Sequence, residues 1–364
     1  MIDPLCLTDE GPDNDLSQAR KVAERIADFM GKAEQELVIA LYDIRLPDPI
    51  GTIVADAFRA AAERGVKVRL AYNDVPEDPH AGNFLPAVNP PPETNPEILA
   101  TLPIETKAIS GIPDLMHHKY MVADGKSIWT GSANWSVYSW TRQENVLVNI
   151  DSSEIAAFYK QNFEELWSTG DVEKSGHSEP KPVKVGDSTV TAWFTPGHGE
   201  ALSQHISSKL GRAKRRIRIA SPVLTSAPIL GTLAELADNP RGIDIGLVID
   251  EPQCDRVFEQ WAATHSKYKI PLLTRVIESL PVSGKRSVPW GTGEVRDFMH
   301  AKVTVVDDTV ILGSFNLSRS GEMNAENMVE IDDAEIAEFY ARFIDEVRSR
   351  YPRSSVPGSK NRTH

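Results

Sequence analysis

The feature that most constrains this sequence is a motif that occurs twice, once in each half of the chain. The first copy consists of MHHKYMVADG at 116–125, TGSANWS at 130–136 and QENVLV at 143–148. The second consists, in the same order, of MHAKVTVVDD at 299–308, LGSFNLS at 312–318 and AENMVEI at 325–331. Corresponding residues lie 183 positions apart up to the aspartate and 182 apart after it. Because a long-range repeat marks a duplicated structural unit, the chain is predicted to contain two similar halves.

The repeat extends upstream as a pattern of strands and helices. In the first half, apolar runs at 37–42 and 66–72 flank an alanine-rich stretch at 51–64 that has helical spacing. The second half has the same arrangement of two apolar runs around a helical stretch, at 217–220, 243–249 and 227–237. Both patterns are typical of a βαβ unit, so each half is predicted to be an α/β domain.

Composition divides the chain into its expected domains. The stretch DVEKSGHSEPKPVKVGDS at 171–188 is rich in Pro, Ser, Gly and charged residues, which is typical of a linker. We therefore expect an N-terminal domain at 1–170, a C-terminal domain at 189–351 and a flexible tail at 352–364. The proline-rich stretch at 77–97 is predicted to be an irregular loop.

The histidines and lysines of the motif suit the cleavage of a phosphodiester. On a strand that begins at residue 117, His117 and Lys119 share one face, while His118 points the other way. The same register pairs His300 with Lys302. Near neutral pH a histidine can attack phosphorus as a neutral imidazole, or protonate the leaving oxygen as an imidazolium. The lysines supply positive charge to the non-bridging oxygens.

Two further residues of the repeat complete this predicted site. Asn134 and Asn316, which end the two GSxN elements, can add hydrogen-bond donors where negative charge develops. The sequence shows no cluster at metal-ligand spacing, so the chemistry is predicted to need no metal and no cofactor. A single His-x-Lys pattern is more often an ordinary strand with solvated side chains, but two intact copies favour catalysis.

With two His-x-Lys-x4-Asp motifs, each followed by GSxN, the sequence resembles the phospholipase D superfamily. The segment WFTP at 193–196 also resembles the strand and loop that open the second half of its members. The resemblance implies an α/β fold of two pseudo-twofold-related phospholipase D-like sandwich domains with mixed sheets. It further implies one shared active site at the interface between these domains.

The resemblance also assigns roles to individual residues. It implies a phosphohistidine intermediate, with His117 as the provisional nucleophile and His300 as the general acid and then base. Glu144 and Glu326 match the family's downstream acid, which orients a histidine by accepting its second N–H. The remaining motif residues are expected to be structural: Asp124, Asp307, Ser132 and Ser314.

The predicted function is phospholipase D-type hydrolysis, or head-group exchange, of a phospholipid phosphodiester. The alternative is a metal-independent nuclease of the same superfamily that cleaves DNA or RNA. A non-catalytic phosphate-binding module ranks last, because both motifs are complete. A cardiolipin-synthase-like transferase ranks below the nuclease, since such proteins usually carry N-terminal membrane helices and none is evident in the sequence.

Composition bears on partners and location. The formal net charge of −13 repels polyanions, which favours neutral or zwitterionic phospholipids over nucleic acid. No run approaches the roughly 20 apolar residues that span a bilayer, and the N-terminus lacks a signal-peptide pattern. A cytoplasmic protein is therefore expected, with at most transient contact with a membrane surface. Since one chain holds both motifs, a monomer is expected to suffice for an active site.

Overall fold

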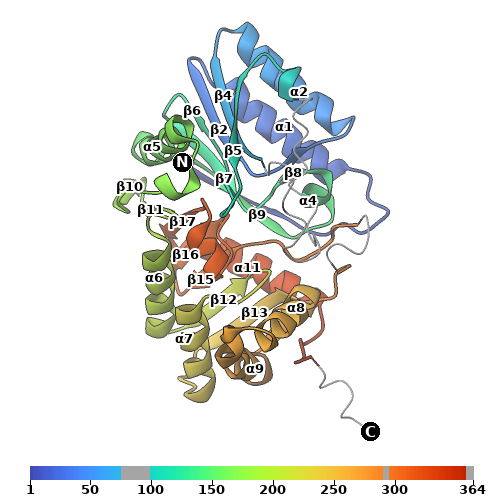
Figure 1. Ribbon diagram of the computed structural model, residues 1–364, viewed down its shortest axis with the longest axis vertical. Helices are drawn as coiled ribbons and strands as arrows, with labels where there is room; N and C mark the ends of the chain where they lie inside the picture. Colours follow the sequence, from blue (N-terminus) through green and yellow to red (C-terminus); the bar gives the residue numbers. More distant parts are fainter. Residues whose placement is uncertain (75–98, 290–294, 358–364) are drawn as a thin grey trace.

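The computed structural model describes residues 1–74, 99–289 and 295–357. Its two halves are stacked along the long axis of the molecule, each around one β-sheet (Figure 1). The first sheet has the strand order β1-β9-β7-β6-β2-β4-β5. The strands are β1 (Ile2–Leu7), β2 (Glu36–Leu41), β4 (Lys67–Asp74), β5 (Glu105–Ser110), β6 (Lys119–Ala123), β7 (Ser127–Gly131) and β9 (Asn145–Asp151).

The second sheet repeats this arrangement, in the order β10-β11-β17-β16-β15-β12-β13-β14. Its strands are β10 (Pro182–Val185), β11 (Ser188–Phe194), β12 (Arg216–Ala220), β13 (Asp244–Asp250), β14 (Val282–Lys285), β15 (Val303–Val306), β16 (Thr309–Gly313) and β17 (Asn327–Asp332). In both sheets three neighbouring strands are parallel and the others pair antiparallel. The predicted α/β fold of two similar domains with mixed sheets is confirmed, and the sequence repeat is a repeat of strand order.

Helices cover both faces of each sheet. On one face of the first sheet lie α1 (Ser17–Gly31) and α2 (Ile50–Glu63), and on one face of the second lie α6 (Gly199–Arg212), α7 (Ala227–Asp238), α8 (Glu251–Ala262) and α9 (Ile270–Ser279). The opposite faces carry α5 (Ser153–Thr169) and α11 (Ala334–Arg350). None of these helices is long and apolar enough to cross a membrane.

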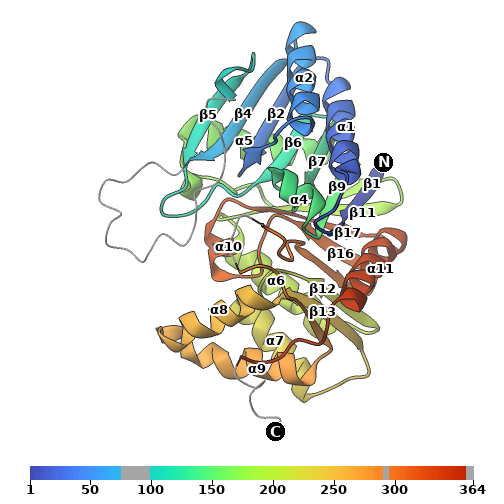
Figure 2. The ribbon, with the colours of Figure 1, turned by 90° about the vertical axis from the view of Figure 1, so that its right-hand side faces the viewer.

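Helices α5 and α11 lie where the two halves meet, and they share one hydrophobic core (Figure 2). Tyr159 of α5 packs against Phe194 of β11, while the hydroxyl of Tyr340 in α11 donates to the carbonyl of Leu147 in β9 at 2.7 Å. The interface is therefore a continuation of both cores. The remaining short elements are β3 (Ile44–Arg45), β8 (Trp135–Ser136), α4 (Val137–Thr141), η2 (Val172–Lys174), η3 (His265–Lys269) and α10 (Arg319–Met323).

Two matching turns tie the hairpin of each half to its central strand. Asp124 follows β6 and Asp307 follows β15, both with positive φ angles, of 51° and 54°. The Asp124 carboxylate accepts the backbone N–H groups of residues 34, 35 and 36 at 2.8–2.9 Å. The Asp307 carboxylate accepts those of residues 214, 215 and 216 at 2.8–3.1 Å. The single residue by which the two copies differ lies in this hairpin turn.

Two predicted boundaries differ from the structure, and a third prediction lies outside it. The predicted linker at 171–188 contains β10, which pairs antiparallel with β11, because the second sheet extends by one strand at this edge. The predicted flexible tail at 352–364 is ordered at its start: Gly284 donates to the carbonyl of Pro352 and Ser354 donates to that of Val282. These residues hydrogen-bond to backbone groups on the outer edge of β14, the last strand of the sheet. The predicted loop at 77–97 lies outside the described residues.

Replacing either turn aspartate with alanine is expected to destabilise the protein. Asp124→Ala and Asp307→Ala each leave three backbone N–H groups without their acceptor and put a Cβ-bearing apolar residue at positive φ. We expect a loss of about 1–3 kcal/mol for each, measured by equilibrium urea unfolding. Asp124→Asn, which tolerates positive φ and keeps an acceptor, is the control and should lose less. Equal losses for Ala and Asn would contradict this account.

Candidate active site

The two motif histidines lie just before central strands and contact the opposite half of the molecule. The backbone N–H of His117 donates to the carbonyl of Ala325, which lies just before β17, at 2.9 Å. The backbone N–H of His300 donates to the carbonyl of Glu144, just before β9, at 3.3 Å. Each histidine is therefore anchored to a segment that belongs to the other repeat.

Because of these contacts, the first motif strand is shorter than predicted. Strand β6 begins at Lys119, not at residue 117, because Met116 forms a parallel bridge with Ala325 across the interface. The N–H of Met116 is accepted by the Asn73 side chain at the end of β4. In the second half, Asp250 at the end of β13 accepts the N–H of Met299 in the same way. A side chain from the middle one of the three parallel strands thus holds each segment before its histidine.

The imidazole of His117 is held by a carboxylate from the opposite half. Its Nδ1 lies 2.8 Å from both Oε1 and Oε2 of Glu326, and both side chains are buried. The edge of the ring packs against Tyr42, with 4.7 Å between ring centroids. A carboxylate can only accept here, so Nδ1 carries the hydrogen and Nε2 keeps its lone pair. The contact predicted for Glu326 is present, and it crosses the interface.

The imidazole of His300 is held by an amide rather than by a carboxylate. Its Nδ1 lies 3.1 Å from Oδ1 of Asn145. The orientation of this amide is fixed, because its Nδ2 donates to the carbonyl of Ser139 at 2.9 Å and its Oδ1 accepts the Ser132 hydroxyl at 2.7 Å. Oδ1 therefore also accepts from Nδ1 of His300, which again leaves the Nε2 lone pair free.

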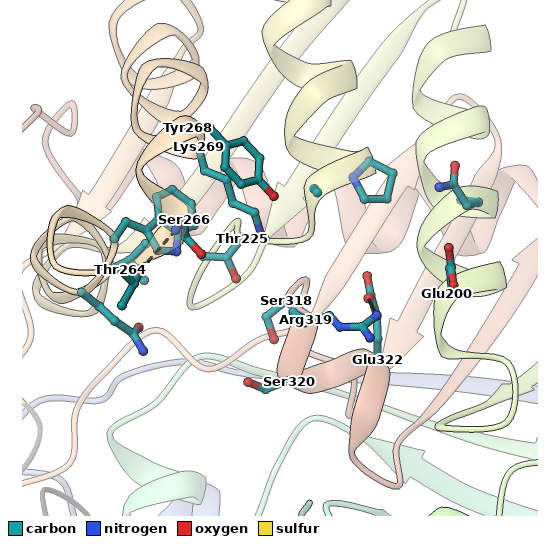
Figure 3. Close-up of a pocket in the computed structure, with 16 residues that line it drawn as sticks. Glu200, Thr225, Thr264, Ser266, Tyr268, Lys269, Ser318, Arg319, Ser320 and Glu322 are labelled. Atoms are coloured by element: carbon teal, nitrogen blue, oxygen red, sulfur yellow. Dashed lines mark hydrogen bonds and ion pairs between the residues drawn. The ribbon is translucent and has the colours of Figure 1, made fainter. Parts of the chain in front are cut away.

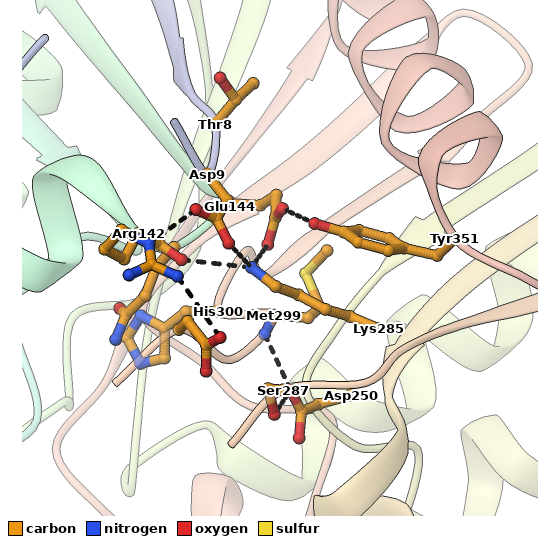
Figure 4. A network of polar contacts seen from close by, with 12 residues as sticks. Thr8, Asp9, Arg142, Glu144, Asp250, Lys285, Ser287, Met299, His300 and Tyr351 are labelled. Atoms are coloured by element: carbon orange, nitrogen blue, oxygen red, sulfur yellow. Dashed lines mark hydrogen bonds and ion pairs between the residues drawn. The ribbon is translucent and has the colours of Figure 1, made fainter. Parts of the chain in front are cut away.

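The predicted contact of Glu144 with a histidine is wrong. Its carboxylate instead accepts from Nζ of Lys285 at 2.9 Å and from the hydroxyl of Tyr351, both from the second half (Figure 4). Nζ of Lys285 also contacts the Asp9 carboxylate at 3.0 Å and the carbonyl of Arg142 at 3.2 Å. Asn145, the next residue, takes the place on His300 that was predicted for Glu144.

The two motif lysines are buried beside the histidines and brace them. Nζ of Lys119 donates to the carbonyl of His117 at 2.6 Å, and Nζ of Lys302 donates to that of His300 at 2.8 Å. Lys119 also lies over the ring of Tyr42, 4.9 Å from its centroid. Each ammonium therefore retains donors for a bound anion while it fixes the backbone of its histidine.

Burial and mutual repulsion disfavour the protonated forms of the basic groups in this cluster. Burial, and then the charges of both motif lysines, lower the pKa of His117 well below its usual value. Burial, Lys302, Lys119 and His117 do the same to the pKa of His300. Burial also lowers the pKa of Lys119 to about 7 and raises that of Glu326 to about 7. Residues of both halves thus act on one another within one cluster.

The asparagines and serines of the two GSxN elements differ in their contacts. The Oδ1 atoms of Asn134 and Asn316 are buried and have no hydrogen-bond partner in the described part of the chain. Rotation of either amide would present its N–H₂ group at the same place, so both have capacity for a ligand. Ser132 and Ser314 instead bond to Asn145 and Asn327 at the start of the neighbouring strand.

His118 points away from this cluster, as its register predicted. It is buried between the halves, where Nδ1 lies 3.2 Å from Oδ1 of Asn327 and the ring packs on Tyr120 and Phe194. Burial lowers the pKa of His118 to about 3. Its neutral ring is therefore part of the interface core.

A cavity of about 700 Å³ lies in the second half, between α6, α7, η3 and α10 (Figure 3). Its wall includes Lys269, Arg319, Glu200 and Glu322, and neither motif histidine lines it. Ser318, two residues after Asn316, is part of the wall. Among the described residues, no group of three His, Cys, Asp or Glu side chains is placed to hold a metal ion.

Both motif histidines are expected to carry their hydrogen on Nδ1 in the substrate-free protein at pH 7. The contacts of His117 with Glu326 and of His300 with Asn145 fix this tautomer. Long-range ¹H–¹⁵N correlation spectra should show it, with His117→Gln and His300→Gln used to assign the signals. An Nε2–H tautomer for either histidine would contradict the geometry.

Comparison with known proteins identifies the family to which both halves belong. Residues 26–167 and 206–348 match the family described as cardiolipin synthase, PLD-like domain. Over 305 residues the chain is 27% identical to cardiolipin synthase 1 of Bacillus cereus, which covers 78% of this chain and 56% of that protein. Over 57 residues it is 46% identical to a mitochondrial cardiolipin hydrolase of Xenopus tropicalis, covering 15% of this chain and 27% of that protein.

A solved structure shows the same fold over almost the whole chain. The phosphatidylserine synthase of Haemophilus influenzae superposes with a TM-score of 0.62 and 17% identity, covering 96% of this chain and 86% of that one. The chain spans about a quarter of the length of the matched cardiolipin hydrolase and little more than half of that of the cardiolipin synthase. The family match, by contrast, covers both halves of this chain. The chain therefore belongs to the phospholipase D superfamily, in the family of cardiolipin-synthase-type PLD-like domains.

Proposed function

We propose that the protein cleaves a phosphodiester of a phospholipid and transfers the phosphatidyl group to water or to an alcohol, through a phosphohistidine intermediate. The observation that carries the proposal is the pair of buried histidines, one from each half, each with its Nδ1 engaged by a side chain of the opposite half. The phosphate oxygens can accept hydrogen bonds from two lysines and two asparagine amides: Lys119, Lys302, Asn134 and Asn316.

The first step joins the phosphorus to a histidine. Nε2 of His117 attacks phosphorus, the bond from phosphorus to the head-group oxygen breaks, and His300 as imidazolium gives its proton to that oxygen. His117 takes the nucleophilic role because the Glu326 carboxylate at its Nδ1–H stabilises the positive charge that its ring acquires.

The second step releases the product and restores both histidines. Neutral His300 takes the proton of a water or alcohol, whose oxygen attacks phosphorus, and the bond from phosphorus to Nε2 of His117 breaks. The pKa of His300 is low in the free protein because of burial and of the neighbouring positive charges. A bound phosphodiester anion offsets those charges, so substrate binding itself favours the imidazolium form that the first step needs.

Two observations support a phospholipid as the substrate. The matched family is described as cardiolipin synthase, and the matched relatives are named as a cardiolipin synthase and a cardiolipin hydrolase. The net charge of −13 opposes binding of a long polyanion such as nucleic acid. These names favour a cardiolipin-synthase-like transferase, which the sequence alone ranked below the nuclease, and we now rank it above the nuclease.

The test is an assay on vesicles of phosphatidylcholine, phosphatidylglycerol or cardiolipin, with and without glycerol as acceptor, and with and without EDTA. Single-stranded and duplex DNA and RNA form the second arm. We expect head-group release or exchange that EDTA leaves unchanged. His117→Ala and His300→Ala should each lower the rate on the order of 10²–10⁴-fold. His177→Ala, at an exposed histidine, is the matched control.

Trapping the intermediate separates the roles of the two histidines. Rapid acid-free quenching with ³²P-labelled phospholipid should leave label on His117, in wild type and more strongly in His300→Ala. Label on His300 alone would exchange the two roles. Full activity in either alanine variant would refute the mechanism, and cleavage of nucleic acid without any action on lipid would refute the substrate class.

A further inference from the structure

The backbone hydrogen bonds that join each motif histidine to the opposite half, called the crossings below, differ in register by one residue. The N–H of His117 donates to Ala325, the residue before Glu326, whereas that of His300 donates to Glu144 itself. In the repeat, Ala325 corresponds to Gln143 and Glu326 corresponds to Glu144. The pairing partner of the second histidine is thus displaced by one position along the chain.

This displacement determines which side chain contacts Nδ1 of each histidine. Along an extended segment successive side chains point to opposite sides, so a shift of one residue exchanges them. In each case the contact comes from the residue that follows the backbone acceptor. Glu326 contacts Nδ1 of His117, and Asn145 contacts Nδ1 of His300. The Glu144 carboxylate is consequently on the far side, away from His300.

A buried cation holds the Glu144 carboxylate on that far side. Lys285 lies at the end of β14 with its ammonium buried, and it contacts both Glu144 and Asp9 of the first half (Figure 4). The hydroxyl of Tyr351 donates to the same carboxylate. Arg142 binds the other oxygen of Asp9 at 2.9 Å and lies 3.6 Å from Asp297. The carboxylate is therefore neutralised within a closed network.

The two histidines consequently have different charges behind them. The positive charges of Lys302, Lys119 and His117 act on His300, and the side chain at its Nδ1 is the neutral amide of Asn145. His117 has the same two lysines around it, but a carboxylate touches its Nδ1. A neutral amide stabilises an imidazolium less than a carboxylate does, so His300 is the stronger acid of the two.

We infer that Lys285 is a positioning residue, which withdraws Glu144 from the active site so that a neutral amide, not a carboxylate, stands behind His300. The inference deepens the proposed function, on which it rests: it makes the duplicated histidines unequal and suits His300 to proton donation. Lys285 touches neither histidine, and it acts through Glu144 and through the register of the crossing.

The test measures the pKa of His300 directly, without substrate. Titrations followed by the ¹H–¹³C signal of its ring, assigned with His300→Gln, compare wild type with Lys285→Met. Removing the cation leaves the buried Glu144 carboxylate with the Tyr351 hydroxyl as a donor but without the charge that balances it, so its negative charge can act on the His300 ring. We expect the pKa of His300 to rise by about one unit or more. An unchanged pKa in the folded variant would overturn the inference.

Two matched variants keep the test decisive. Lys285→Met combined with Glu144→Gln removes both charges and should return the pKa of His300 to its wild-type value. A pKa that stays high would show that Lys285 does not act through Glu144. Glu144→Gln alone, which leaves Lys285 paired with Asp9, should leave the pKa of His300 unchanged and remains informative if Lys285→Met fails to fold. A lower pKa in Glu144→Gln would show that Glu144 serves His300 directly, against the inference.

Activity then separates this inference from the proposed function. In Lys285→Met the alkaline limb of the pH–rate profile, where the proton donor loses its proton, should move to higher pH by the same amount as the His300 pKa, with Lys285→Arg as the charge-preserving control. If wild type cleaves no phosphodiester, the proposed function fails, but the spectroscopic titration still decides the role of Lys285. If the titration moves and the alkaline limb does not, His300 is not the proton donor and the inference loses its functional part.

Discussion

The exchange of chain segments between the two halves is the interaction on which the site depends. Each half builds a complete sheet, yet neither supplies the group behind its own histidine: Glu326 contacts His117, and Asn145 contacts His300. The shared core around α5 and α11 continues both domain cores across the interface. The distances within the site are therefore set by core packing, and separating the halves would remove the site together with much of the buried apolar surface.

Burial of so much positive charge is unfavourable in the free protein. Two lysines and two histidines lie in one water-poor cluster with Glu326 as the carboxylate in contact, and burial lowers the pKa of each basic group. The lysines are braced on carbonyls, so they do not relax when the site is empty. Such a cluster is preorganised for a bound anion, which offsets the repulsion without a rearrangement.

The sequence predicted those parts of the molecule that the repeat encodes locally. The two similar α/β halves follow from the repeat, and the outward direction of His118 follows from alternation along an extended segment, although the strand itself begins only at Lys119. Contacts across the interface could not be predicted in this way: the pairing of Glu144 depends on a register that only the packed halves define. The repeat itself held one unused signal, since Asn145 recurs as Asn327, whereas Lys285 stands in no repeated pattern.

A duplicated fold tends to make its two histidines equivalent, but phosphoryl transfer needs one to attack and the other to carry a proton. The structure breaks the equivalence at more than one point of the second motif. Asn73 accepts the N–H before His117, whereas the acidic Asp250 accepts that before His300. Burial raises the pKa of Asp250 to about 6, against the hydrogen bonds from Ser287, Met299 and Gln253, which lower it. Near the second motif, the carboxylate of Asp250 binds a backbone N–H and that of Glu144 binds Lys285. At the first motif, the carboxylate of Glu326 contacts the ring of His117 itself. The chemical difference between the two histidines therefore arises from where each carboxylate is placed.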